Sequence, residues 1–144
     1  MLKGISPLLS PELLQNLAMM GHGDEIVLAD AHFPGHALNP NVLRADGIRI
    51  ADLLKAILPL VEPDAYVENP LLMMKPVDGD HANPEVEDSY LSSVQITHPQ
   101  IKSFGKLERF AFYERARNAF AILMTGETAK YGNVILKKGV TPVL

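Results

Sequence analysis

The chain has 144 residues, of which 47% are hydrophobic, with a formal net charge of -4 and no cysteine. This length and composition favour one domain over residues 1–144 with a buried core, and they exclude a disordered chain. The acidic balance argues against a nucleic-acid-binding protein, and the lack of cysteine excludes disulfides and thiolate chemistry and fits a cytoplasmic protein.

The first third of the chain predicts a helix, a strand and an irregular segment. Ser10 is a typical N-cap, Pro11 suits the first helical position, and Gly21 is a typical helix stop. Residues 25–30 contain a continuous apolar run, which predicts a buried strand. Residues 32–36 contain both proline and glycine, so we expect them to be irregular.

The middle of the chain continues this alternation. We expect a short strand over 42–44 and a helix over 48–58, whose apolar residues recur at intervals of three and four and which Asp46 caps. An apolar run over 71–74 predicts another strand, and residues 77–80 predict a turn.

The last third supplies the remaining elements. Asn83 predicts the cap of a helix that reaches about Val94, and a further helix is expected over 110–118. Apolar runs over 120–124 and 133–137 predict two strands. Helices that alternate with apolar strands indicate an α/β fold: a single layered domain with a mostly parallel or mixed sheet flanked by helices.

A histidine stands between two glycines where the first helix gives way to the first strand. The segment at residues 21–24 reads Gly-His-Gly-Asp, and Asp30 closes the strand eight residues after His22. The glycines permit a tight turn, and histidine exchanges protons near neutral pH. This pattern indicates that His22 and Asp30 both reach a small polar ligand at the edge of a sheet.

A second polar turn leads into the final strand. Tyr131 can donate or accept a hydrogen bond, Asn133 offers amide donors and a carbonyl acceptor, and Gly132 lets the backbone approach a ligand. These residue types suit a ligand with several hydroxyl groups.

The segments that carry these motifs resemble one known family. Residues 21–24, the run Val-Leu-Ala-Asp-Ala at 27–31 and the Phe-Pro pair at 33–34 resemble the N-terminal signature of the bacterial sugar mutarotases. That family contains the L-fucose mutarotases and the D-ribose pyranases. Residues 108–116 and 125–140 resemble the C-terminal half of the fucose branch.

Two positions separate the branches. In the ribose branch we expect Tyr-Ala-Asn where this chain has Tyr-Gly-Asn at 131–133, and a non-aromatic residue where this chain has Tyr113. The resemblance also includes residues 1–7, so it extends over essentially the whole chain.

The resemblance implies an enzyme without metal or cofactor that interconverts the α and β anomers of a free sugar. It implies that His22 is the proton donor and that Asp30, Arg109 and residues 131–133 bind the sugar. It further implies a ring-shaped homo-oligomer, commonly a decamer, with sites near subunit contacts, and no membrane or nucleic-acid partner.

Mutarotation opens a hemiacetal ring and closes it on the other face, so one group takes a proton while another gives one. His22 suits this exchange, and Tyr131 is predicted to be the second proton-transfer group or to orient the hydroxyl on which His22 acts. Asp30 is predicted to accept from sugar hydroxyls or to hold the His22 tautomer, and Arg109 to donate to hydroxyls. Phe33 and Tyr113 are the aromatic candidates for packing on the apolar face and the C6 methyl of fucose.

Three other interpretations stay open. D-ribose pyranase is the nearest alternative within the family. A non-catalytic sugar-binding protein would use the same polar turns. A metal-dependent isomerase or hydrolase would use His22, Asp30, His32 and His36, although Pro34 and Gly35 prevent the helix that would align the last two histidines.

Overall fold

The structure, a computed structural model, describes residues 1–143. Its five helices are α1 (Pro11–Met19), α2 (Gly35–Leu38), α3 (Ile50–Ile57), α4 (Pro84–Gln95) and α5 (Arg109–Asn118). Its six strands are β1 (Glu25–Ala29), β2 (Val42–Ala45), β3 (Leu71–Met74), β4 (Gly105–Leu107), β5 (Ala121–Thr125) and β6 (Val134–Lys137).

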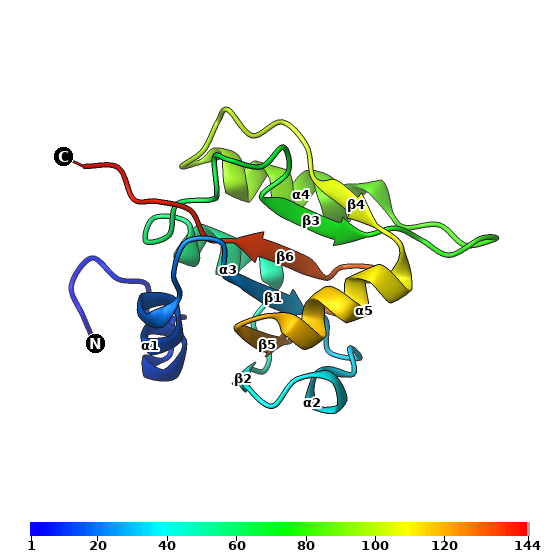
Figure 1. Cartoon of the computed structure of the whole chain (residues 1–144), viewed down its shortest axis with the longest axis horizontal. Coiled ribbons are helices and arrows are strands. Elements are labelled where there is room, and N and C mark those ends of the chain that lie inside the picture. The colour runs from blue at the N-terminus through cyan, green and yellow to red at the C-terminus, as the bar shows by residue number, and fades with distance from the viewer. Residues whose placement is uncertain (144) are drawn as a thin grey trace.

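The six strands form one mixed sheet in the order β2-β5-β1-β6-β3-β4 (Figure 1). β2, β5 and β1 pair in parallel, as do β3 and β4, whereas β6 lies antiparallel between β1 and β3. The carboxyl ends of five strands therefore lie at one edge of the sheet, together with the amino end of β6. The predicted α/β fold with a mixed sheet is confirmed.

Helices cover both faces of the sheet, because successive strand residues point to opposite sides. In β1, Ile26 and Leu28 pack with α1, α3 and α4, while Val27 and Ala29 face α5. Phe112 of α5 is fully buried against this second face. Two apolar layers therefore pack against the faces of the sheet, and polar side chains can gather where the strands begin and end.

Local sequence signals explain most element boundaries. The Ser10 hydroxyl accepts a hydrogen bond from the Leu13 N–H (3.1 Å), and the Asn83 side chain accepts from the Glu85 N–H (3.0 Å), so both predicted caps are confirmed. The predicted Asp46 cap is wrong. α3 begins after Arg49, and the Asp46 carboxylate instead pairs with Arg44 (3.0 Å).

Two other expectations need correction. Residues 32–36 are not wholly irregular, because the four-residue helix α2 begins at Gly35. The three-residue strand β4 was not predicted, since its sequence, Gly-Lys-Leu, has too short an apolar pattern. Arg109 comes two residues after β4, where the parallel strands end.

No helix within residues 1–143 combines the length and the apolar character needed to cross a membrane.

The turn after β5 depends on a close contact between two glycines. A Cβ at Gly126 would lie 2.5 Å from the Gly47 Cα, whereas a Cβ at Gly21 would lie 3.6 Å from the Asp24 carboxylate. The Gly126→Ala substitution would therefore push the backbone at Gly126 away from the backbone at Gly47, and we expect it to lower the free energy of unfolding by about 1–3 kcal/mol. Urea unfolding at matched protein concentration measures this, with Gly21→Ala as the near-neutral control. Equal stability of the two variants would contradict the close-contact account.

Candidate active site

The carboxyl edge of the sheet carries most of the predicted site residues. Asp30 directly follows β1, Arg109 follows β4, and Asn133 directly precedes β6. β6 runs antiparallel to β1, with Val134 opposite Leu28, so Asn133 lies beside Asp30. The Asn133 side-chain oxygen accepts a hydrogen bond from the Asp30 N–H at 2.7 Å. Ligand sites in open α/β sheets commonly lie at this edge.

These residues line a cleft of about 270 Å³. Six of the predicted residues lie on its wall: Asp30, Phe33, Arg109, Tyr113, Tyr131 and Asn133. The cleft volume is just below the range for small-molecule pockets, about 300–1,000 Å³. Its size and polar lining suit a small ligand rich in hydroxyl groups.

One wall of the cleft is aromatic. The Phe33 and Tyr113 rings meet edge to face with centroids 5.6 Å apart. Arg109 lies over the Tyr113 ring at 5.5 Å, and its Nε donates to the Tyr113 hydroxyl at 3.3 Å. The guanidinium is thereby held beside an apolar surface, with other N–H groups free to reach a ligand.

Asp30 is a buried carboxylate whose pKa is raised by its surroundings. It is 9% exposed, and its Oδ1 accepts from the His32 N–H at 2.9 Å. Burial raises the pKa of Asp30 above its ordinary value, and the hydrogen bond from His32 offsets this only in part. A carboxylate with a raised pKa is better suited than a surface aspartate to exchange a proton near neutral pH.

The Tyr131 hydroxyl is held by a residue that sequence reasoning treated only as part of a turn. It donates to Asp80 Oδ2 at 2.7 Å, and Lys130 Nζ also lies 2.9 Å from that oxygen. The hydrogen bond to Asp80 raises the pKa of Tyr131, which makes the phenol harder to deprotonate. With its hydrogen directed at Asp80, the phenol oxygen can accept from a ligand.

Gly132 does not line the cleft but fixes the turn that does. A Cβ at Gly132 would lie 3.0 Å from the Tyr90 hydroxyl, so a larger residue would crowd that side chain. The Tyr90 hydroxyl lies 2.9 Å from the Gly132 carbonyl and 3.2 Å from Glu127 Oε1. Arg49 Nη1 lies 3.1 Å from Glu127 Oε2 on the same carboxylate. This network, buried at Tyr90 and Glu127 and exposed at Arg49, connects α4 and the start of α3 to the turn.

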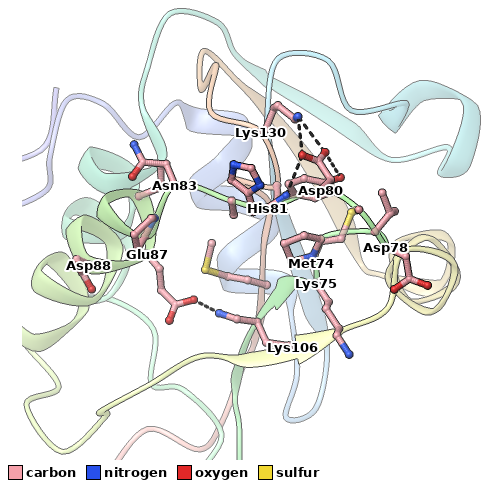
Figure 2. A pocket seen from close by; sticks show the side chains of 18 residues that line it. Met74, Lys75, Asp78, Asp80, His81, Asn83, Glu87, Asp88, Lys106 and Lys130 are labelled. Atoms are coloured by element: carbon pink, nitrogen blue, oxygen red, sulfur yellow. Dashed lines mark hydrogen bonds and ion pairs between the residues drawn. The ribbon is translucent and has the colours of Figure 1, made fainter.

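A larger hollow of about 550 Å³, shown in Figure 2, shares Lys130 and Tyr131 with the wall of the cleft. Figure 2 shows Asp80 beside Lys130, and Lys106 meeting Glu87 across the hollow. These charged groups pair with one another, and Asp30, Arg109 and Asn133 are not on its wall. The smaller cleft is therefore the better candidate for the site.

His22 lies at the opposite edge of the sheet. It precedes β1, whereas Asp30 follows it, and a five-residue strand alone spans roughly 17 Å. His22 is not on the cleft wall, and its Nε2 lies 3.0 Å from Asp64 Oδ1 instead. The structure therefore separates His22 from the other predicted residues within one chain.

The histidines proposed for a metal site do not gather. His32 lines the cleft, whereas His36 Nε2 lies 3.1 Å from Arg44 Nη1. Across the part of the chain that the structure describes, no group of three or more histidine, aspartate or glutamate side chains is placed to hold a metal ion.

Sequence reasoning missed Asp64 and Asp80. Both lie in loops. Asp64 contacts His22, which is 42 positions away in the sequence, and Asp80 contacts Tyr131, which is 51 positions away. The sequence around Asp80 predicts only a turn, and neither aspartate belongs to a periodic apolar pattern.

With this geometry established, the chain can be compared with known proteins. Residues 3–141 match the RbsD / FucU transport protein family, and the chain belongs to that family.

Three members of this family show how similar the chain is to individual proteins. An L-fucose mutarotase of Haemophilus influenzae is 62% identical over 144 residues, covering all of both chains. A fucose mutarotase of Streptococcus pneumoniae, solved in complex with L-fucose, is 43% identical with a TM-score of 0.92, covering 98% of this chain and 100% of that one. RbsD of Bacillus subtilis, solved with D-ribose, shares the fold at 24% identity, with a TM-score of 0.71 and coverage of 99% and 100%.

The ion pairs of Asp80 predict a pH-dependent contribution to stability. Hydrogen bonds from Tyr131 and Lys130 lower the pKa of Asp80 well below the ordinary value of 3.8. A depressed folded-state pKa stabilises the fold above the unfolded pKa, and this contribution is lost as the pH falls toward the folded value. Asp80→Asn should therefore lower the melting temperature at pH 7, and the deficit should shrink below about pH 4.

Thermal unfolding of wild type and variant at pH 7 and pH 3 measures this effect. Asp78→Asn is the matched control, because Asp78 is an exposed carboxylate in the same turn. A deficit that stays the same at both pH values would contradict the assigned ion pairs.

Proposed function

We propose that this protein catalyses the interconversion of the α and β anomers of L-fucose. The observation that carries this proposal is the cleft at the carboxyl edge, where Asp30, Arg109, Tyr131 and Asn133 meet in a chain 62% identical to an L-fucose mutarotase. Polar groups on one side and aromatic rings on the other match the two faces of a 6-deoxy sugar.

The cleft suits L-fucose better than D-ribose. The edge-to-face pair of Phe33 and Tyr113, with Met74 beside it, offers an apolar surface for the C6 methyl group. Ribose has no such methyl group, so it would leave this surface uncovered. We therefore expect slower catalysed anomer exchange for D-ribose than for L-fucose in the same assay.

The reaction requires two proton transfers. At ring opening, His22 takes the proton of the anomeric hydroxyl, while a protonated Asp30 gives its proton to the ring oxygen as the C1–O5 bond breaks. Rotation about C1–C2 follows, and closure on the other face returns both protons. The Tyr131 hydroxyl already directs its hydrogen at Asp80 (2.7 Å), whereas Asp30 is buried at the cleft wall with a raised pKa, so Asp30 is the better placed second proton-transfer group. Tyr131 and Arg109 then orient the hydroxyls.

Since His22 and the cleft occupy opposite edges of the sheet, the complete site requires two chains. The His22 of one copy reaches the cleft of a neighbouring copy in a homo-oligomer. Exposed aromatic side chains flank both half-sites: Tyr66 beside His22 is 80% exposed, and Phe110 beside Arg109 is 68% exposed. Aromatic side chains are enriched at protein–protein interfaces, which fits a contact between the two half-sites.

The assembly we propose is the ring, commonly a decamer, that the family resemblance implies. Catalysis needs no metal or cofactor, and the cysteine-free composition fits a cytoplasmic location.

His22→Ala should reduce catalysed anomer exchange of L-fucose by about 10²–10⁴-fold, toward the spontaneous rate, because it removes one proton-transfer group. L-fucose should still bind, since the cleft is intact. Saturation-transfer NMR measures the exchange, and ligand titration measures the binding.

His36→Ala is the control, because His36 is exposed and contacts Arg44 away from the cleft. If His22→Ala exchanges anomers at the wild-type rate, His22 has no part in the reaction. If the wild type binds L-fucose without accelerating exchange, the protein is a non-catalytic binder.

A further inference from the structure

A buried carboxylate lies behind the proposed catalytic histidine. His22 Nε2 lies 3.0 Å from Asp64 Oδ1, and the side chains are 46% and 4% exposed, respectively. The imidazole is thus open to solvent on one side and anchored on the other. This arrangement is typical of a carboxylate that fixes the orientation of a functional histidine.

The charge of Asp64 determines which nitrogen of His22 carries hydrogen. The Tyr66 N–H donates to Asp64 Oδ1 at 3.0 Å, and this bond, followed by the bond from His22, keeps the pKa of Asp64 below its ordinary value. An ionised carboxylate only accepts hydrogen bonds. The hydrogen of the neutral imidazole therefore lies on Nε2, and Nδ1 keeps a free lone pair.

The backbone fixes the two residues relative to each other. The Gly23 N–H, next to His22, donates to the Lys138 carbonyl at 2.8 Å, and the Asp64 N–H donates to the Lys137 carbonyl at 3.0 Å. Both loops are thus tied to the end of β6. A Cβ at Gly139 would lie 2.7 Å from the Asp64 Cα, so this glycine permits the close approach.

We infer that Asp64 is a positioning residue for anomer exchange: it holds the His22 ring with hydrogen on Nε2 and directs Nδ1 toward the sugar. The inference rests on the proposed function, because it assigns the reacting atom of His22. Nδ1 takes the anomeric hydroxyl proton at ring opening and returns it at closure. Between these steps the Asp64 carboxylate stabilises the positively charged imidazolium.

Asp64→Asn should lower kcat about 10–100-fold, because an amide can also donate and so permits the opposite tautomer. KM for L-fucose should stay within about 2-fold, since Asp64 does not touch the cleft. Anomer exchange measured by NMR over a range of sugar concentrations separates the two constants. Glu62→Gln is the matched control, because Glu62 pairs with His98 (3.3 Å) in the same segment, and we expect wild-type kcat.

A double variant separates positioning from a structural role. If Asp64 acts through His22, then His22→Ala with Asp64→Asn should show the same residual rate as His22→Ala alone. A further loss in the double variant, or an unchanged kcat in Asp64→Asn, would overturn the inference while leaving the proposed function intact. Wild-type exchange in His22→Ala would instead overturn the proposed function.

One measurement does not depend on whether an Asp64 variant folds. In wild-type protein labelled with 15N-histidine, the signals of His22 are assigned by their loss in His22→Ala. At a pH where the ring is neutral, the hydrogen is expected on Nε2. Hydrogen on Nδ1 would overturn the inference.

Discussion

The antiparallel direction of β6 is the constraint on which the rest of the structure depends. Because β6 runs against β1 and β3, its first residue lies at the edge where the parallel strands end, and its last residue lies at the edge where they begin. The strand therefore brings Asn133 to Asp30 at one edge and supports the His22 and Asp64 loops at the other. One strand thus organises both halves of the proposed site.

The two halves have different physical characters. The cleft half is a polar and aromatic pocket, in which burial raises the pKa of Asp30 and the phenol of Tyr131 is fixed by Asp80. The histidine half is a projecting turn whose imidazole is half exposed and held from behind. In the proposed reaction, each half supplies one proton-transfer group, Asp30 from the cleft and His22 from the turn.

Sequence patterns predict the fold where local signals dominate. The apolar run of β1 and the caps at Ser10 and Asn83 specify their elements directly, and the order of helices and strands indicates the α/β class. β4 escapes prediction because its three residues acquire strand geometry only by pairing with β3. The Asp46 cap fails because α3 begins only after Arg49, three residues beyond Asp46, whose carboxylate pairs with Arg44.

The site is less accessible to sequence reasoning, since its contacts are non-local. The glycine-flanked histidine and the aspartate that follows the strand predict that His22 and Asp30 share a ligand. Within one chain, however, the five-residue strand β1 lies between them and spans roughly 17 Å. Asp64 and Asp80 gain their roles only when the fold brings them to His22 and Tyr131. The proposed meeting of the two half-sites between chains would depend on the assembly, which no local pattern specifies.

The most direct test of the two-chain site is complementation between inactive variants. His22→Ala retains an intact cleft, and Asp30→Asn retains an intact histidine turn. Co-expressed in equal amounts, they should form mixed oligomers in which about a quarter of the sites are complete, and L-fucose exchange should recover accordingly. If the mixture is as inactive as either variant alone, each site belongs to a single chain and the account is contradicted.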